Sequence, residues 1–300
     1  MTRPNLQRYA RLSVLVSLLV IGLKIGAYAL TGSVGLLSDA LESLTNVAAA
    51  LIALIVLGVA VRPPDDEHNY GHDKAEYFAS AAEGALILIA ALSIGFSALD
   101  RLFNPHPLEQ LDLGLAVSLL ATLINGLTAR TLAQVGKRHG SITLEADAKH
   151  LMTDVYTSLG VVVGLVLVAL TGLLWLDSVV ALLVALHIVA SGAGLLHRSA
   201  HGMMDSALSA QDVQAVQSVL DSYAQRYAIQ HHALRTRQAG PRKFISVHVL
   251  VPDAWTVKRG HDLLEQLEGD IRNSLGRDYV NVSTHLEPLN DPCSHRDSEL

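Results

Sequence analysis

The chain has 300 residues, of which 50% are hydrophobic and only 17% are charged, and its mean hydropathy of +0.35 is above that of an ordinary soluble domain. The net charge of −6, with no basic patch interleaved with aromatic side chains, excludes nucleic acid as an expected partner. The single cysteine, Cys293, excludes an internal disulfide framework and a cysteine-rich zinc ribbon, and we interpret it as an ordinary surface thiol.

Long apolar runs dominate the first two thirds of the chain. A helix needs roughly 20 mostly apolar residues to cross about 30 Å of hydrocarbon. Six runs meet this length, near residues 10–30, 34–61, 78–101, 112–134, 143–170 and 175–197. The first run follows Arg3, Arg8 and Arg11, but no small-residue cleavage site leads from it into a soluble mature domain. We therefore predict six membrane helices, the first of which is not a signal peptide.

The distribution of basic residues predicts the orientation of these helices. An even number of spans places both termini on the same side of the membrane, and the basic residues gather there: Arg3, Arg8, Arg11, Arg62, Lys74, Arg130, Lys137, Arg138 and Arg198. On the opposite side only Arg101 is nearby. The positive-inside rule assigns the basic side to the cytoplasm. We expect a multi-pass protein of the cell inner membrane with both termini cytoplasmic.

The last third of the chain has the pattern of a small soluble domain. Helices are predicted over residues 209–227 and 256–275, and strands near 232–237, 244–251 and 280–286. Two helices on a three-stranded sheet form an α+β domain. The predicted organisation is a transmembrane domain over residues 1–205, a cytoplasmic domain over 206–290 and a polar tail over 291–300.

Polar side chains recur at matched positions in the second and fifth spans. Ionisable residues inside a span are costly and by default mark a transport path or site. Each set has offsets of 0, 3 and 7 and so lies on one helix face: Asp39, Glu42 and Asn46, then Asp147, His150 and Asp154. Because two halves of three spans run in opposite directions, this repeat indicates an inverted topology with a site at the repeat interface.

The residue types in this repeat suit a divalent metal ion. Glu42 with Asn46, and His150 with Asp154, are spaced four residues apart, so two facing helices would offer four ligands of the kinds that tetrahedral Zn²⁺ accepts. Two carboxylates also neutralise a 2+ ion away from bulk water. A single buried polar residue would favour an ordinary interhelical hydrogen bond, but six in matched register favour a metal site.

A loop after the second span holds a further candidate site. Asp65, His68 and His72 have plausible metal-ligand spacing if the segment forms a helix or a tight loop. Polar membrane loops are commonly rich in such residues, so the spacing alone is equally consistent with a solvated loop.

Histidines of the predicted soluble domain form a third candidate set. His232 and His248 lie on adjacent strands and His261 on the second helix, while His285 and Glu287 are two residues apart on the last strand and share one face. Scattered histidines are usually surface or hydrogen-bonding residues, but four with a carboxylate on strands that pair favour a metal site.

Together these features resemble the cation diffusion facilitator family, most closely its bacterial ferrous-iron and zinc efflux branch. The likeness covers nearly the whole chain. It includes the six spans, the loop DDEHNYGHDKAE of residues 65–76, the pair His150 and Asp154, Met204-Asp205, the strand HALRTRQAG from His232, and His285-Leu-Glu-Pro. The resemblance implies a homodimeric metal/proton antiporter with a metallochaperone-like, ferredoxin-like cytoplasmic domain.

The resemblance also implies three metal sites. They are a transport site of Glu42, Asn46, His150 and Asp154, a loop site of Asp65, His68 and His72, and a regulatory binuclear site of His232, His248, His261, His285 and Glu287. Zinc-transporting members have Asp-xxx-Asp where this chain has Glu42 and Asn46, so Asp39, one turn earlier, is a further candidate ligand. Histidine in the fifth span favours Zn²⁺, with Fe²⁺, Co²⁺, Mn²⁺ and Cd²⁺ as alternatives.

Two other functions compete with transport. One is a membrane-bound metal sensor that transports nothing, and the other is an embedded metalloenzyme, although the chain has neither His-Glu-xx-His nor a glycine-rich phosphate loop. We expect no enzyme activity and no catalytic cofactor. The expected partners are Zn²⁺ or another divalent metal as substrate and regulatory ligand, protons, membrane lipid and a second copy of the chain.

Overall fold

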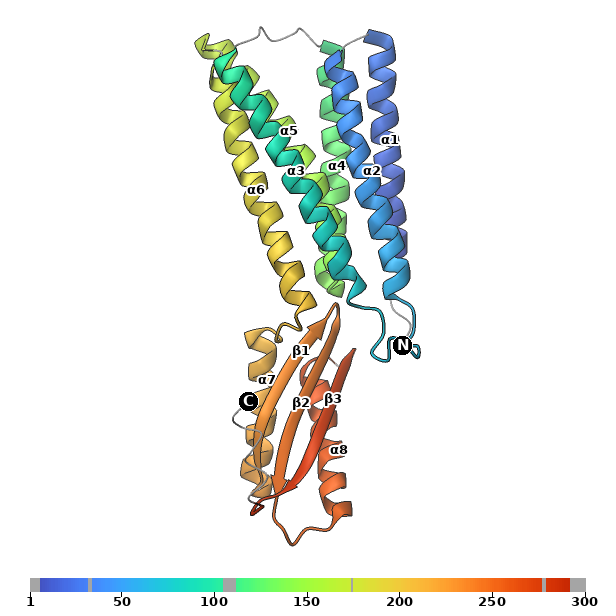
Figure 1. Ribbon diagram of the computed structural model, residues 1–300, viewed down its shortest axis with the longest axis vertical. Coiled ribbons are helices and arrows are strands. Elements are labelled where there is room, and N and C mark those ends of the chain that lie inside the picture. Colours follow the sequence, from blue (N-terminus) through green and yellow to red (C-terminus); the bar gives the residue numbers. More distant parts are fainter. Residues whose placement is uncertain (1–5, 32–33, 105–111, 174, 277–278, 292–300) are drawn as a thin grey trace. The chain divides into compact units, whose positions relative to one another are not determined.

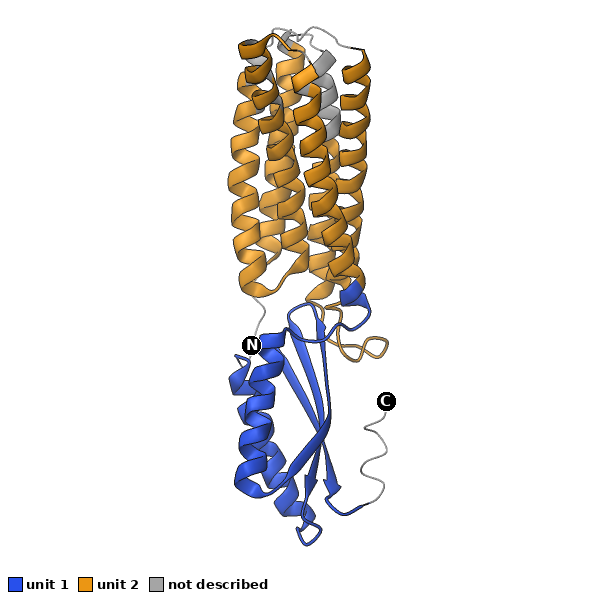
Figure 2. Ribbon diagram, turned by 90° about the vertical axis from the view of Figure 1, so that its left-hand side faces the viewer, with its two compact units in different colours: residues 1, 201–300 blue, residues 2–200 orange. Residues whose placement is uncertain are grey.

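The chain folds into two compact units. The computed structural model describes residues 6–31, 34–104, 112–173, 175–276 and 279–291. Residues 2–200 form one unit, the helical unit, and residues 201–300 form the other, the α/β unit (Figure 2). Each unit has its own core and is described by itself. The predicted polar tail, residues 291–300, lies almost wholly outside the described residues.

Six long helices make up the helical unit (Figure 1). They are α1 (Gln7–Thr31), α2 (Val34–Ala60), α3 (Ala75–Phe103), α4 (Asp112–His139), α5 (Ile142–Thr171) and α6 (Trp175–Met203). Within the described residues five of them, all but α4, are long and apolar enough to cross a membrane. The described part of α4 contains Asn125, Arg130 and Gln134, which lower its hydropathy. The predicted helical membrane domain is confirmed.

Two of these helices continue beyond the predicted apolar runs. α4 reaches His139 and α6 reaches Met203. A helix keeps its backbone hydrogen bonds after it leaves an apolar environment, so hydropathy does not mark its end. The last turn of α4 contains the basic residues Lys137, Arg138 and His139. Positive charge there interacts favourably with the negative end of the helix dipole and stabilises the helix.

The outer faces of the bundle are apolar, and inside it two helices approach each other closely at glycines. Exposed side chains include Leu15, Ile55, Phe96 and Leu186, as expected of a surface that faces lipid. Inside, α3 approaches α6 closely, since a Cβ placed on Gly84 would lie 3.3 Å from the Gly192 carbonyl oxygen. Small residues commonly allow such approaches between membrane helices.

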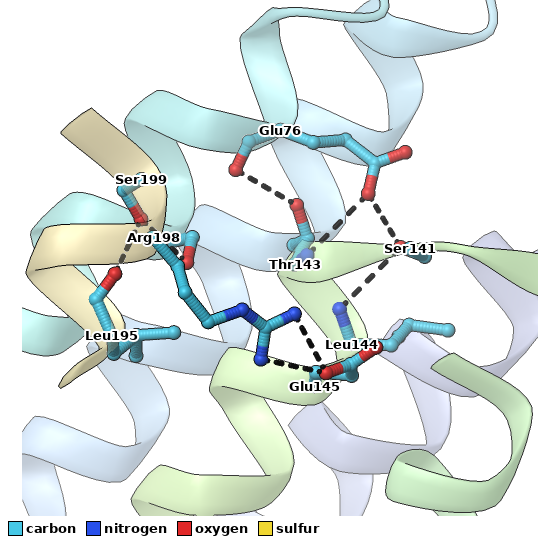
Figure 3. Close-up of polar contacts among 9 residues, drawn as sticks. Glu76, Ser141, Thr143, Leu144, Glu145, Leu195, Arg198 and Ser199 are labelled. Carbon is cyan, nitrogen blue, oxygen red and sulfur yellow. Dashed lines mark hydrogen bonds and ion pairs between the residues drawn. The ribbon is translucent and has the colours of Figure 1, made fainter. Parts of the chain in front are cut away.

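A polar cluster ties α3, α5 and α6 together at the end of the bundle where α3 and α5 begin. Figure 3 shows the Glu76 carboxylate accepting hydrogen bonds from the Ser141 hydroxyl at 2.5 Å and the Thr143 amide at 3.4 Å. Ser141 is also the N-cap of α5, so Glu76 places negative charge at the positive end of that helix. Beside it, both terminal nitrogens of Arg198 donate to Glu145 at 3.1 Å.

Replacing Glu76 by alanine is expected to lower the free energy of unfolding by about 1–3 kcal/mol, because buried donors of Ser141 and Thr143 lose a charged acceptor. Thermal unfolding in detergent, followed by circular dichroism, measures this change. The matched control is Glu67→Ala, whose side chain is exposed in the loop before α3 and whose effect should stay within about 0.5 kcal/mol. Equal melting temperatures for the two variants would contradict the bracing role.

The α/β unit is a three-stranded sheet with two helices. Its elements are α7 (Ala210–Tyr227), β1 (Gln230–Ala239), β2 (Arg242–Val251), α8 (Val257–Ser274) and β3 (Val280–Pro288). The strand order is β1-β2-β3, with β1 antiparallel and β3 parallel to β2. The predicted α+β fold is confirmed.

The core of this unit lies on one face of the sheet. Val247 and Val249 of β2 are fully buried and belong to one apolar cluster with residues of α7 and α8, among them Leu220 and Leu267. Side chains alternate along a strand, so His248, between the two valines, points to the opposite face. The sheet thus has one face packed in the core and one face available for a site.

Candidate functional site

Asp154 is the centre of a polar cluster inside the helical unit. Its Oδ2 accepts hydrogen bonds from the Asn46 amide of α2 and, at 3.1 Å, from the Asn125 amide of α4. Both asparagines are buried. Polar side chains from α2 and α4 therefore meet the carboxylate of a third helix, α5. The sequence placed Asn46 and Asp154 on facing helices, and the structure brings them into contact.

His150 lies one turn before Asp154 on α5 and is only 3% exposed. Neither of its ring nitrogens has a hydrogen-bond partner among the described residues, and the same holds for the Oδ1 atoms of Asn46 and Asn125. Buried polar atoms are normally paired, because an unpaired one costs about 1–3 kcal/mol. A bound cation could accept an electron pair from one of the two imidazole nitrogens and from the amide oxygens, since both kinds of atom ligate metals.

Sequence reasoning missed Asn125. Its polar neighbours at helical spacing, Thr122 and Thr128, carry hydroxyl groups and no ionisable group, so no repeat of ionisable residues indicated it. The only available signal was an amide inside a span. Conversely, the side chains of the predicted ligands Asp39 and Glu42 lie outside the described residues.

The loop between α2 and α3 folds around Asp65. The carboxylate accepts a hydrogen bond from the His68 backbone amide at 2.7 Å, and its two oxygens contact His68 Nδ1 at 3.1 Å and His72 Nε2 at 3.3 Å. The three ligand atoms lie within 4.8 Å of one another. This is the tight loop that the metal interpretation of Asp65, His68 and His72 required.

The pKa of Asp65 lies below its ordinary value, chiefly because the His68 backbone amide donates to the carboxylate. The carboxylate therefore stays ionised at neutral pH and faces two imidazoles. A charged oxygen with two nitrogens is a donor set that Zn²⁺ and its neighbours in the first transition row accept.

Three histidines form a row across the sheet of the α/β unit. His232 of β1 is paired with His248 of β2, and His248 is paired with His285 of β3. The rings follow the pairing, with centroids 5.0 Å apart for the first pair and 4.8 Å for the second. The strand register thus brings together three histidines from distant parts of the chain. The sequence predicted that they lie on neighbouring strands but not which positions are paired.

Glu287 lies beside this row, two residues after His285 on the same face of β3. Its carboxylate oxygens lie 2.8 Å from His232 Nε2 and 2.9 Å from His248 Nδ1, while His285 Nδ1 is 3.7 Å away. Partial burial acts to raise the pKa of Glu287, but the His232 hydrogen bond and the nearby histidine charges outweigh it, so the pKa lies below its ordinary value. His232, His248 and Glu287 have ligand atoms within 4.8 Å of one another.

His261 does not join this group. It lies near the start of α8 with an exposed side chain, and the ligand group found among the described residues of this unit contains His232, His248 and Glu287 only. From the sequence alone, α8 could pack on the sheet with different faces toward the core. Leu263, Leu264 and Leu267 pack into the core, and this orientation leaves His261 exposed and apart from the histidine row.

Replacing His248 by alanine is expected to remove one tightly bound Zn²⁺ per chain, because His248 is central in the row and contacts Glu287 directly. The fall in affinity should exceed the roughly 10–100-fold that loss of an outer partner of a metal ligand causes. Equilibrium dialysis of the full chain in detergent measures it. His261→Ala is the matched control, and an equal loss of metal there would show that His261, on the same or a second copy, is a ligand.

Each of the two units matches a known protein-family model. Residues 10–204 match the family model for the cation efflux transmembrane domain, and residues 208–289 match the model for the cation efflux protein, cytoplasmic domain. An "uncharacterized transporter" of Synechocystis, sll1263, is 50% identical over 98% of this chain and 94% of its own length. Cation-efflux pumps FieF of Serratia proteamaculans and Citrobacter koseri are each 32% identical, covering 96% and 94% of this chain and 95% and 91% of their own.

One solved structure is also similar in sequence to part of the chain. The metal-bound C-terminal domain of the CzcD transporter from Thermotoga maritima is 22% identical and covers 28% of this chain and 99% of that chain, with a TM-score of 0.24.

Proposed function

This chain belongs to the cation diffusion facilitator family of cation efflux transporters, and from that premise we propose that it exports a divalent metal ion from the cytoplasm in exchange for protons. Zn²⁺ is the first candidate, and Fe²⁺, Cd²⁺, Co²⁺ and Mn²⁺ are alternatives. Membership in a transporter family separates the chain from the metalloenzyme alternative.

The observation that carries the proposal is the cluster around Asp154 in the apolar bundle. The Asp154 carboxylate accepts hydrogen bonds from two amides. One turn away is a buried imidazole whose nitrogens have no partner among the described residues, which is a costly arrangement for a purely structural helix contact. Its donor set suits a borderline divalent ion. We assign metal ligation to His150, Asp154 and Asn46, add Asn125 to them, and retain Glu42 and Asp39 as further candidates.

Proton exchange follows from the chemistry of the same ligands. Imidazole changes its protonation near neutral pH, and a proton and a metal ion compete for the same nitrogen. Protons that reach His150 and Asp154 from the opposite side of the membrane would therefore expel the metal ion. Deprotonation on the cytoplasmic side prepares the site to bind the next ion.

We assign the α/β unit, like both termini, to the cytoplasm. The basic residues gather at the helix ends on the side of the two termini, and the positive-inside rule supports this orientation. The row of His232, His248 and His285 with Glu287 would bind metal and bias transport through a homodimer, because a ligand shifts an equilibrium only if it binds two states differently. The Asp65 loop is a second cytoplasmic metal site in this assignment.

Metal uptake into proteoliposomes tests the proposed function. Purified protein is reconstituted, a pH gradient is imposed, and Zn²⁺ entry and internal pH are followed with separate fluorescent dyes. We expect Zn²⁺ flux that depends on the gradient and is accompanied by opposite proton flux. Metal binding without flux would favour a sensor, and flux without proton movement would overturn the antiport mechanism.

A further inference from the structure

Glu83 of α3 and Asp147 of α5 are two buried acids that the transport site does not include. Glu83 is 0% and Asp147 1% exposed. Among the described residues, no side chain or backbone group makes a hydrogen bond of normal geometry with any of the four carboxylate oxygens. An acid buried in this way inside a membrane bundle is expensive unless a positive charge accompanies it.

The two carboxyl groups belong to one place in the bundle. They interact electrostatically across the contact between α3 and α5. Ile87, one turn after Glu83, and Ala146, beside Asp147, pack in the same buried cluster. Two carboxylates near enough to interact repel each other, so each increases the cost of burying the other in its charged form.

Hydroxyl groups of α1 complete the surroundings. The Ser13 hydroxyl lies near the Asp147 carboxyl group, and Ser17 follows one turn later on the same helix face. Both serines are at most 2% exposed, and neither hydroxyl oxygen has a partner within accepted geometry among the described residues. Buried oxygen atoms from α1, α3 and α5 thus lie in this part of the bundle.

We propose that Glu83 and Asp147 form a second divalent-cation site within the membrane domain, through which a metal ion passes before it reaches His150 and Asp154. The proposal rests on the proposed transport function for its direction of travel but not for the binding itself. Two carboxylates balance a 2+ charge, and the serine hydroxyls extend an all-oxygen donor set. Such a set suits hard ions such as Mn²⁺ better than a site containing imidazole does.

The position of the pair suits a station on the way to the transport site. Asp147 precedes His150 by three residues, so the two side chains lie on the same face of α5, separated by about 4.5 Å of helix rise. Asp147 lies closer to the start of α5, where Ser141 and Glu76 form the polar cluster of Figure 3. An ion at this station would next meet the buried imidazole of His150.

Site-specific carboxyl labelling tests the proposal. A hydrophobic carbodiimide reacts with buried carboxyl groups, a bound cation blocks it, and peptide mass spectrometry reports Glu83 and Asp147 separately. In the full chain carrying Asp154→Asn, which disables the transport site, Mn²⁺ is expected to reduce labelling of both residues severalfold. Labelling of Asp100, an exposed acid on α3, should not change with Mn²⁺.

Two outcomes would overturn the proposal. Labelling of Glu83 and Asp147 that is insensitive to Mn²⁺ would mean that the pair holds protons alone. Protection in the wild type that disappears in Asp154→Asn would place the ion at the transport site only. Because labelling requires no flux, absence of transport by the wild type would refute the proposed function and leave this result interpretable.

Transport supplies the second measurement. Glu83→Gln keeps the shape of the side chain and removes its charge, and we expect Mn²⁺ flux at low metal concentration to fall about tenfold, mainly through a raised KM. Asp100→Asn removes an acid from the same helix and should leave flux unchanged. Wild-type flux in Glu83→Gln, with the protein folded, would show that metal does not pass this station.

Discussion

Asp154→Asn is expected to lower metal export by at least about 100-fold, more than the 10–100-fold typical of a residue that only supports a metal ligand. The substitution keeps the size of the side chain but removes the charge that accepts both the Asn46 and Asn125 amides. His150→Ala should have a comparable effect, because it removes a buried imidazole one turn from Asp154 on which protons and metal compete.

Zn²⁺ flux in proteoliposomes at a fixed pH gradient measures both variants. Thr153→Val is the matched control. Thr153 is buried on the same helix next to Asp154, but its hydroxyl donates to the Lys149 carbonyl of α5 itself. Its flux should stay within about twofold of the wild type, since surrounding packing is kept. Normal flux in a folded Asp154→Asn or His150→Ala protein would remove those residues from the transport site.

Asn46→Asp is expected to narrow the range of exported ions by about tenfold in favour of Zn²⁺ and Cd²⁺ over Mn²⁺, since a carboxylate binds a 2+ ion more strongly than a neutral amide. The structure adds a second consequence. Asn46 donates its amide to Asp154, so aspartate would replace a donor by an acceptor. The two carboxylates would then repel unless a proton or metal ion lay between them, and flux should depend more steeply on pH.

Flux of Zn²⁺, Cd²⁺, Fe²⁺, Co²⁺ and Mn²⁺ at two pH values distinguishes these effects. Thr45→Ser, at an exposed position of the same helix, serves as control and should keep the wild-type ion profile. An unchanged profile in Asn46→Asp would place Asn46 outside the ligand set, and Asp39 would become the better candidate. Asn125→Asp, measured in parallel, shows whether the second amide at Asp154 has the same role.

The sequence was informative wherever a feature depends on one element. Runs of about 20 apolar residues must form helices in lipid, because every backbone polar group has to be bonded within the segment. Spacing within an element also survives folding. His150 and Asp154 share a helix face, and Asp65, His68 and His72 meet inside one loop. Helix ends were less well predicted, since α4 and α6 continue as polar helices beyond their apolar runs.

By itself, then, the sequence determined the family, the helical membrane domain, the α+β domain and the residue types of the candidate metal sites. Tertiary structure alone decided which side chains from different elements meet. Strand register aligned His232, His248 and His285, and core packing left His261 outside. The packing of the helices brought Asn125 to Asp154 and placed Glu83 near enough to Asp147 for the two acids to interact. The physical reason is that periodicity fixes directions within an element, whereas contacts between elements depend on how entire apolar faces pack together.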